Sequence, residues 1–148
     1  MDTLIELYDE RAIENVLAAD MFRPQRIVYL CPIEVAQSRE RQEQIGDFFR
    51  HRGWNPELIF LEASLYKVDR ILRQLLAISE KYPDCAMDVT GGSDAELFAA
   101  GLFAAKAETI AVVVYTSIPQ SGAASAPLGG RLPVRGGPWR NPPPWRWA

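Results

Sequence analysis

The sequence predicts an α/β fold, a Rossmann-like three-layer sandwich built on a mainly parallel five-stranded sheet. Short apolar runs alternate with longer segments of helical period through residue 116. Each connection is long enough to hold a crossover helix, which makes consecutive strands parallel and the crossovers right-handed. The runs are almost continuously apolar, as is typical of a sheet that helices cover on both faces.

The five strands are expected at residues 3–8, 26–30, 58–61, 86–89 and 110–115. If their spatial order is 3-2-1-4-5, the direction of chain progress reverses between the first and fourth strands. Ligands of such sheets bind outside the carboxyl ends of the strands at this reversal. The loops to consider are therefore those after the first and the fourth strand.

Four helices are expected between the strands. Asp9 is placed to cap the first, which would turn Ile13, Val16 and Leu17 inward. The second runs over residues 34–52 and ends at Gly53. The third covers residues 64–82.

The fourth helix, residues 94–107, is apolar or small nearly all round. Leu97, Phe98, Leu102 and Phe103 alternate with alanines and Gly101. Such a helix is expected to be buried on more than one side. It then lies either inside the fold or at a subunit interface, and the pattern leaves both open.

Charge divides the chain into two parts. The net charge is −3, but residues 117–148 hold four arginines and no acid, so residues 1–116 carry −7. An acidic body disfavours a reader of duplex DNA, which needs a basic face for the phosphates. No apolar run is long enough for a membrane span and no secretion signal precedes the first strand, so a cytoplasmic protein is expected.

Residues 117–148 are expected to be a disordered tail, and residues 1–116 a single sensor-like domain. The tail is rich in Pro, Gly, Arg and Trp and has no hydrophobic period. Because the composition changes abruptly after a well-patterned strand, we expect the fold to be truncated after strand five. A shifted reading frame of a longer gene would explain the same change.

The most informative segment is the loop Thr90, Gly91, Gly92 and Ser93, between a strand and a helix. The glycines allow close approach of the backbone to a ligand, and Ser93 with Glu96 has the spacing of a capping box. Acids at the helix start disfavour a tight phosphate cradle. We therefore expect contacts to hydroxyls, bases or backbone.

Several familiar sites are missing from the sequence. It contains neither G-x-G-x-x-G after the first strand nor a Walker A motif, so neither a dinucleotide cofactor nor P-loop hydrolysis is expected. Two isolated cysteines, Cys31 and Cys85, and the single His51 do not make a zinc site. We expect no metal, no cofactor and no catalytic residue. Arg41 lies in a charged cluster at residues 39–43, which we interpret as a solvated helix face.

Three stretches resemble the CARF domain, the CRISPR-associated Rossmann fold: TLIELYDERAIENVLA, RIVYLCP and DVTGGSDAELFAAGLFAAK. The similar group carries a C-terminal restriction-endonuclease-like nuclease, for which residues after the fifth strand provide no PD-(D/E)xK constellation. The resemblance implies a homodimer that binds cyclic oligoadenylate, tetra- or hexa-adenylate, in type III CRISPR antiviral defence. Asp94 stands where a lysine commonly follows the loop.

Carried over by position, the resemblance implies ligand contacts from Tyr8, Asp9 and Glu10 and from the loop at residues 90–93, with Cys31 at the rim. Three interpretations stay open. The chain is a sensor domain without chemistry of its own, a ring nuclease that cleaves the same ligand by orienting a ribose 2′-hydroxyl, or an inactive remnant.

Overall fold

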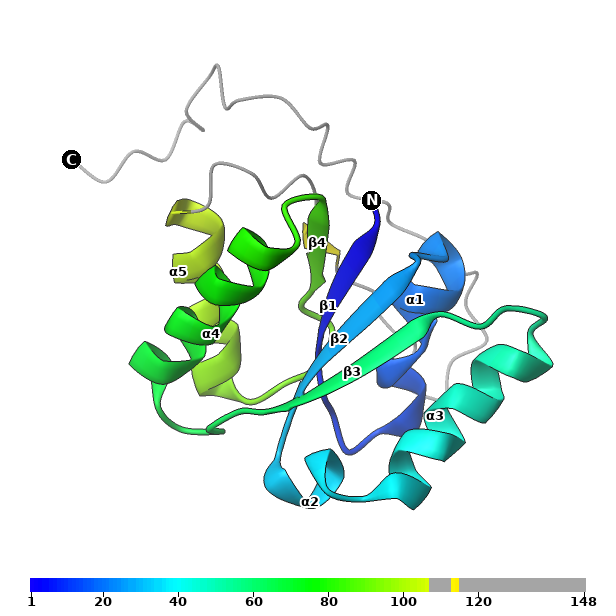
Figure 1. Ribbon diagram of the computed structural model, residues 1–148. Coiled ribbons are helices and arrows are strands. Elements are labelled where there is room, and N and C mark those ends of the chain that lie inside the picture. Colours follow the sequence, from blue (N-terminus) through cyan, green and yellow to red (C-terminus); the bar gives the residue numbers. More distant parts are fainter. Residues whose placement is uncertain (107–112, 115–148) are drawn as a thin grey trace, which may run out of the picture.

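A computed structural model of the protein defines residues 1–106 and 113–114. All strands are parallel, in the order β3-β2-β1-β4-β5, so the predicted order and its reversal between β1 and β4 are confirmed (Figure 1). The strands are β1 Thr3–Leu7, β2 Arg26–Cys31, β3 Glu57–Glu62, β4 Cys85–Asp88 and the short edge strand β5 Val113–Val114.

Four strands of four to six residues form the body of the sheet, and β5 adds two residues beside β4. Of the predicted fifth strand, residues 110–112 and 115 lie outside the described residues. The predicted tail at residues 117–148 lies outside them as well.

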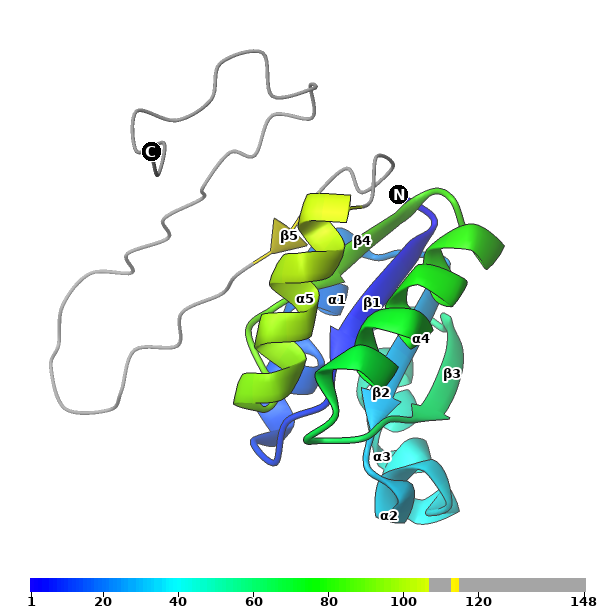
Figure 2. The ribbon, with the colours of Figure 1, turned by 90° about the vertical axis from the view of Figure 1, so that its left-hand side faces the viewer.

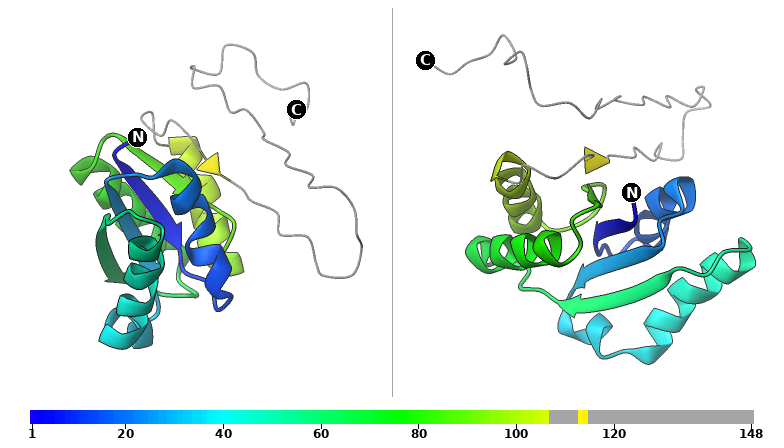
Figure 3. Two further views of the ribbon diagram at one scale, coloured as in Figure 1. Left: turned by 90° about the vertical axis from the view of Figure 1, so that its right-hand side faces the viewer. Right: turned by 45° about the horizontal axis from the view of Figure 1, so that its top comes forward.

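Helices cover both faces of the sheet, which gives the three expected layers. Helices α4 and α5 lie on one face (Figure 2), and η1, α1 and α3 lie on the other (Figure 3, left). Their bounds are η1 Ala12–Asn15, α1 Leu17–Phe22, α2 Ile33–Ala36, α3 Arg39–His51, α4 Val68–Lys81 and α5 Asp94–Lys106.

The alternation of side chains along the strands divides the core into two clusters. Ile5 and Leu7 of β1 pack under α4 and α5 with Ile71, Leu75 and other apolar residues of that face. Leu4 of the same strand faces the opposite cluster, which includes Tyr29 and Phe49. Burial on both sides explains why the sequence of β1 shows no polar alternation.

The predicted helix over residues 34–52 is in fact two helices, α2 and α3. Ser38 interrupts it with extended backbone and caps α3, its Oγ accepting from the Arg41 N–H at 3.3 Å. Gln42 then donates to the carbonyls of Val35 and Ala36, at 3.0 and 2.8 Å, so the end of α2 is not left unpaired. Gly53 follows α3 with φ of +74°, as predicted.

The first helix also differs from the prediction. Asp9 is not its N-cap; the Asp9 carboxylate accepts from the Arg11 N–H at 2.9 Å in a local turn, and η1 begins without a side-chain cap. Val16 separates η1 from α1 with φ of −132°. Val16 is buried as expected, but Ile13 is exposed.

Burial of α5 on several sides is not found. Within the described part of the chain, Leu97, Phe98 and Leu102 are 38%, 63% and 36% exposed, whereas Ala99, Ala100 and Phe103 are buried. The interpretation of α5 as a helix inside the fold is therefore wrong for these residues. The subunit-interface interpretation stays a prediction.

Candidate functional site at the carboxyl edge of the sheet

The loops after β1 and β4 touch each other at the carboxyl edge of the sheet. A Cβ atom on Gly91 would lie 2.8 Å from the Asp9 Cβ and 2.8 Å from the Leu7 carbonyl oxygen. A Cβ on Gly92, where φ is +98°, would lie 2.9 Å from the Leu7 Cβ. Both glycines are therefore required by the packing of the two loops, and Gly92 also by its backbone conformation.

Asn15 fixes the backbone of the loop after β1. Its Oδ1 accepts from the Asp9 N–H and its Nδ2 donates to the Asp9 carbonyl, both at 2.7 Å. The Tyr29 hydroxyl in turn donates to the Asn15 carbonyl at 2.7 Å. The buried Asn15 thus fixes the backbone of Asp9, between Tyr8 and Glu10, at the strand end.

The Asp9 carboxylate is held in its charged form. Partial burial raises the pKa of Asp9. Hydrogen bonds from the Arg11 N–H, the Arg11 guanidinium and the Gly92 N–H lower it by more, so the pKa lies below its usual range. Asp9 therefore joins the two predicted loops and is occupied by protein donors.

Ser93 forms the predicted capping box at the start of α5. The Ser93 N–H donates to Glu96 Oε2 at 2.7 Å, and the Glu96 N–H donates to Ser93 Oγ at 3.3 Å. The Ser93 hydroxyl also donates to the Leu65 carbonyl at 2.8 Å. The helix start is thus occupied by a carboxylate of this chain, consistent with the expectation that it is no phosphate cradle.

Cys31 lies at the end of β2, but its side chain points into the protein. The thiol is fully buried and contacts the Leu61 carbonyl at 3.5 Å. Burial raises its pKa to about 12, with smaller contributions from Glu96 and Glu62. Only the backbone of Cys31 could reach a ligand at this edge.

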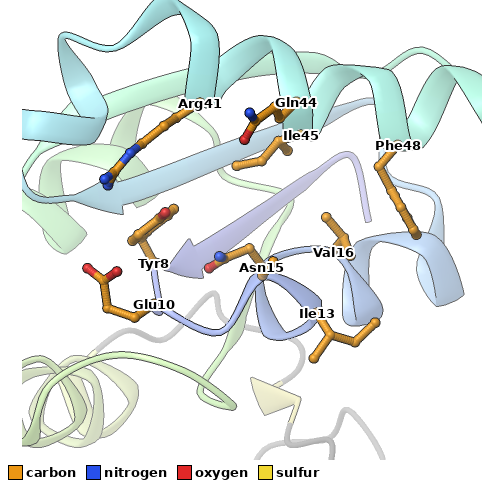
Figure 4. Close-up of a pocket in the computed structure, with 10 residues that line it drawn as sticks. Tyr8, Glu10, Ile13, Asn15, Val16, Arg41, Gln44, Ile45 and Phe48 are labelled. Carbon is orange, nitrogen blue, oxygen red and sulfur yellow. The ribbon is translucent and has the colours of Figure 1, made fainter.

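A cavity of about 600 Å³ lies between η1 and α3, beside the loop after β1 (Figure 4). One end is polar, with Tyr8, Glu10 and Arg41. The other end is lined by apolar side chains, Ala12, Ile13, Val16, Ile45 and Phe48. A pocket of this size with a few polar groups at one end is typical of a small-molecule site.

Arg41 lies on the exposed charged face of α3 that the sequence predicts, and its position beside Tyr8 makes it a functional candidate that the sequence did not indicate. Arg41 is exposed, and its side chain extends from the first turn of α3 toward Tyr8 and Glu10 (Figure 4). Partial burial raises the pKa of Tyr8, while the charge and hydrogen bond of Arg41 act against that rise. Only the helix break at Ser38, which has no clear mark in the hydrophobic pattern, fixes where Arg41 points.

A third loop, between β3 and α4, joins the same edge. The bond from Ser93 to the Leu65 carbonyl ties it to the loop after β4. The Ser64 hydroxyl accepts from the N–H groups of Tyr66 and Lys67, at 3.4 and 3.2 Å. Tyr66 is 84% exposed and Lys67 is exposed. This adds an exposed aromatic residue and a further cationic residue next to the predicted loops.

Within the described ranges, no cluster of His, Cys, Asp and Glu is suited to a metal, and no helix could cross a bilayer. The edge presents backbone, hydroxyl, aromatic, cationic and carboxylate groups beside a pocket with one polar and one apolar end.

No family profile and no curated protein match the chain by sequence. Solved structures do match. One is Can2 from Sulfobacillus thermosulfidooxidans in complex with cyclic tetra-adenylate, with a TM-score of 0.56 and 23% identity over 70% of this chain. Another is Enterococcus italicus Csm6 bound to cyclic hexa-2′-fluoro-hexa-dAMP, with a TM-score of 0.60 and 15% identity over 80% of this chain. This chain has their fold.

The likeness covers 29% of the Can2 chain and 34% of the Csm6 chain, so about a third of each neighbour corresponds to this protein. At this level of identity, the comparison supports the Rossmann-like α/β architecture and leaves ligand and activity to be argued from the site.

Proposed function

We propose that this chain is a sensor domain of the CARF type that binds cyclic oligoadenylate at the carboxyl edge of its sheet. The observation that carries the proposal is the junction of the loops after β1 and β4, packed through Gly91 and Gly92 at the point where the strand order reverses. Two structural neighbours were solved with cyclic adenylate rings, which supports the choice of ligand.

The acidic body meets an anionic ring through a few defined groups. Arg41 and Lys67 supply the cations at the edge, which compensates for Asp94 at the start of α5. The pocket behind Tyr8 takes an adenine base against its apolar end. The Thr90 hydroxyl, whose proton goes to Asp88, accepts from a ribose hydroxyl of the ring.

The same proposal includes a homodimer. The exposed apolar residues of α5, Leu97, Phe98 and Leu102, form the self-complementary surface on which a second copy packs. Sedimentation of the purified chain should therefore show a dimer. A monomer that still bound the ring would show that this surface of α5 is not needed for ligand binding.

The decisive experiment is binding of labelled cyclic tetra- and hexa-adenylate to the wild-type chain and to Arg41→Ala. Loss of the guanidinium should weaken binding by about tenfold or more, as expected for one charge-assisted hydrogen bond. Arg39→Ala is the matched control, because Arg39 lies on the same helical turn but pairs with Glu43 at 2.8 Å.

Retention of a ring without turnover supports the sensor. Linear products would establish the ring nuclease instead. Failure of the folded dimer to bind either ring would overturn the proposal and favour an inactive remnant.

A further inference from the structure

Two carboxyl groups are buried side by side on the adjacent strands β1 and β4, near their carboxyl ends. Glu6 of β1 and Asp88 of β4 are partners in the parallel register, and each is 1% exposed. They follow Leu4 and Ala86 by two residues, so they lie on the face that carries Tyr29. A carboxyl group in such a place needs a hydrogen-bond partner or a proton of its own.

Asp88 is the last residue of β4. It binds Thr90, the first residue of the loop at residues 90–93. Its Oδ1 accepts from the Thr90 N–H at 2.9 Å and from the Thr90 hydroxyl at 2.5 Å. Short bonds of this kind indicate an ionised acceptor. The Asp88 charge thus orients Thr90 directly.

Two other oxygens of the pair lack a hydrogen-bond donor in the described part of the chain, which indicates that one of the carboxyl groups is protonated. Asp88 Oδ2 and Glu6 Oε1 are buried and have no donor among the described residues when both groups are ionised. A proton on Glu6 makes it the donor to Asp88, and the two side chains lie within hydrogen-bonding reach. One proton therefore satisfies both carboxyl groups.

The surroundings favour this arrangement. Burial, then the charge of Asp88 and then the hydrogen bond to it all raise the pKa of Glu6, and no cation of the described residues opposes them. Burial also raises the pKa of Asp88, whereas its bonds from Thr90 and Glu6 lower it. Tyr29, from β2, faces both carboxyls but donates its proton to the Asn15 carbonyl. Glu6 thus keeps the proton and Asp88 the charge.

We propose that Glu6 and Asp88 are positioning residues that share one proton, with Glu6 as donor, so that the Asp88 carboxylate fixes Thr90 at the ligand edge. The proton sharing follows from the pair itself. Only the consequence for ligand binding rests on the proposed function.

The shared proton makes the free energy of unfolding depend on pH in a defined direction. In the unfolded chain Glu6 ionises in its ordinary range, at about pH 4.3. The folded chain keeps the proton to a higher pH, so it binds more protons than the unfolded chain between the two values. Stability must then fall as pH rises through this window, with the unfolding constant rising by up to about tenfold per pH unit for one proton.

The test compares the pH dependence of urea unfolding for the wild type, Glu6→Gln and Glu80→Gln. The glutamine at position 6 still donates to Asp88 but cannot ionise, so it should make the wild-type decline from pH 5 to 8 shallower and be the more stable protein at pH 8. Glu80 is exposed on α4, and its variant should follow the wild-type slope. A Glu6→Gln curve parallel to the wild type would overturn the proposal.

Ligand binding provides the second readout. Asp88→Leu should lose affinity for cyclic oligoadenylate by at least about tenfold, since Thr90 is released. Asp88→Asn should retain much of it, because the amide oxygen still accepts from Thr90. Equal losses in both variants would exclude the positioning role. If the wild type binds no ring, the proposed function fails while the unfolding experiment still decides the shared proton.

Discussion

The loops after β1 and β4 meet at one edge, yet different chemistry holds each in place. A neutral amide, Asn15, holds the loop after β1 through two backbone bonds. Carboxyl groups hold the loop after β4, with Asp88 on Thr90 and Glu96 on Ser93. The two Asn15 bonds do not titrate, whereas the second arrangement depends on the protonation of buried acids. The same edge thus combines a loop held by amide bonds that do not titrate with a loop held by carboxyl groups.

The largest loss of stability is expected for Asn15→Leu. This change leaves the Asp9 N–H and carbonyl unpaired in a part-buried site, at a cost of about 2–4 kcal/mol in the free energy of unfolding. Because the amide does not titrate, urea unfolding should show the same loss at pH 5 and pH 8. A loss that varied with pH would contradict the proposed difference between the loops.

Gly91→Ala tests the contact between the loops. The new Cβ would lie 2.8 Å from the Leu7 carbonyl oxygen, so one loop must shift, at an expected cost of about 1–3 kcal/mol. Thermal unfolding measures the loss. Gly101→Ala on α5 is the matched control, since an added Cβ would meet no other described part of the protein within 4 Å beyond its own helix backbone. Equal behaviour of the two variants would mean that the loops are not in contact.

The smallest effect is expected for Ser93→Ala. It removes the cap of α5 and the bond to the Leu65 carbonyl, and should cost about 1 kcal/mol. Urea unfolding at pH 7 measures it. Ser93→Thr retains the hydroxyl and should recover most of the loss. A loss as large as that of Asn15→Leu would show that the loop after β4 depends on its cap more than on Asp88.

The sequence was sufficient for the features that depend on hydrophobic runs and on the spacing of turn residues. The four main strands, their order and the capping box of Ser93 and Glu96 are of this kind. The break between α2 and α3 was missed, because Gln37 and Ser38 do not interrupt the helical pattern strongly. Arg41 was missed with it, since the direction of a surface side chain depends on where its helix begins.

The buried carboxyl pair was also beyond reach of the sequence pattern. Glu6 and Asp88 lie in otherwise largely apolar strands, where the sequence pattern shows each only as an isolated polar residue. Only the register of β1 against β4, which the pattern does not contain, places them opposite each other. Long-range pairing of this kind decides how an acid behaves once it is buried.

The helix is interrupted at Gln37 and Ser38, so the direction of Arg41 depends on how many residues separate it from the start of α3. Each residue turns an α-helix by about 100°, so one residue inserted into or deleted from α3 before Arg41 would rotate the guanidinium away from Tyr8 without changing its identity. Length variation at this joint is thus a simple route by which related chains could gain or lose a cation at the ligand edge. Sequence alignments that tolerate a gap there would conceal the change.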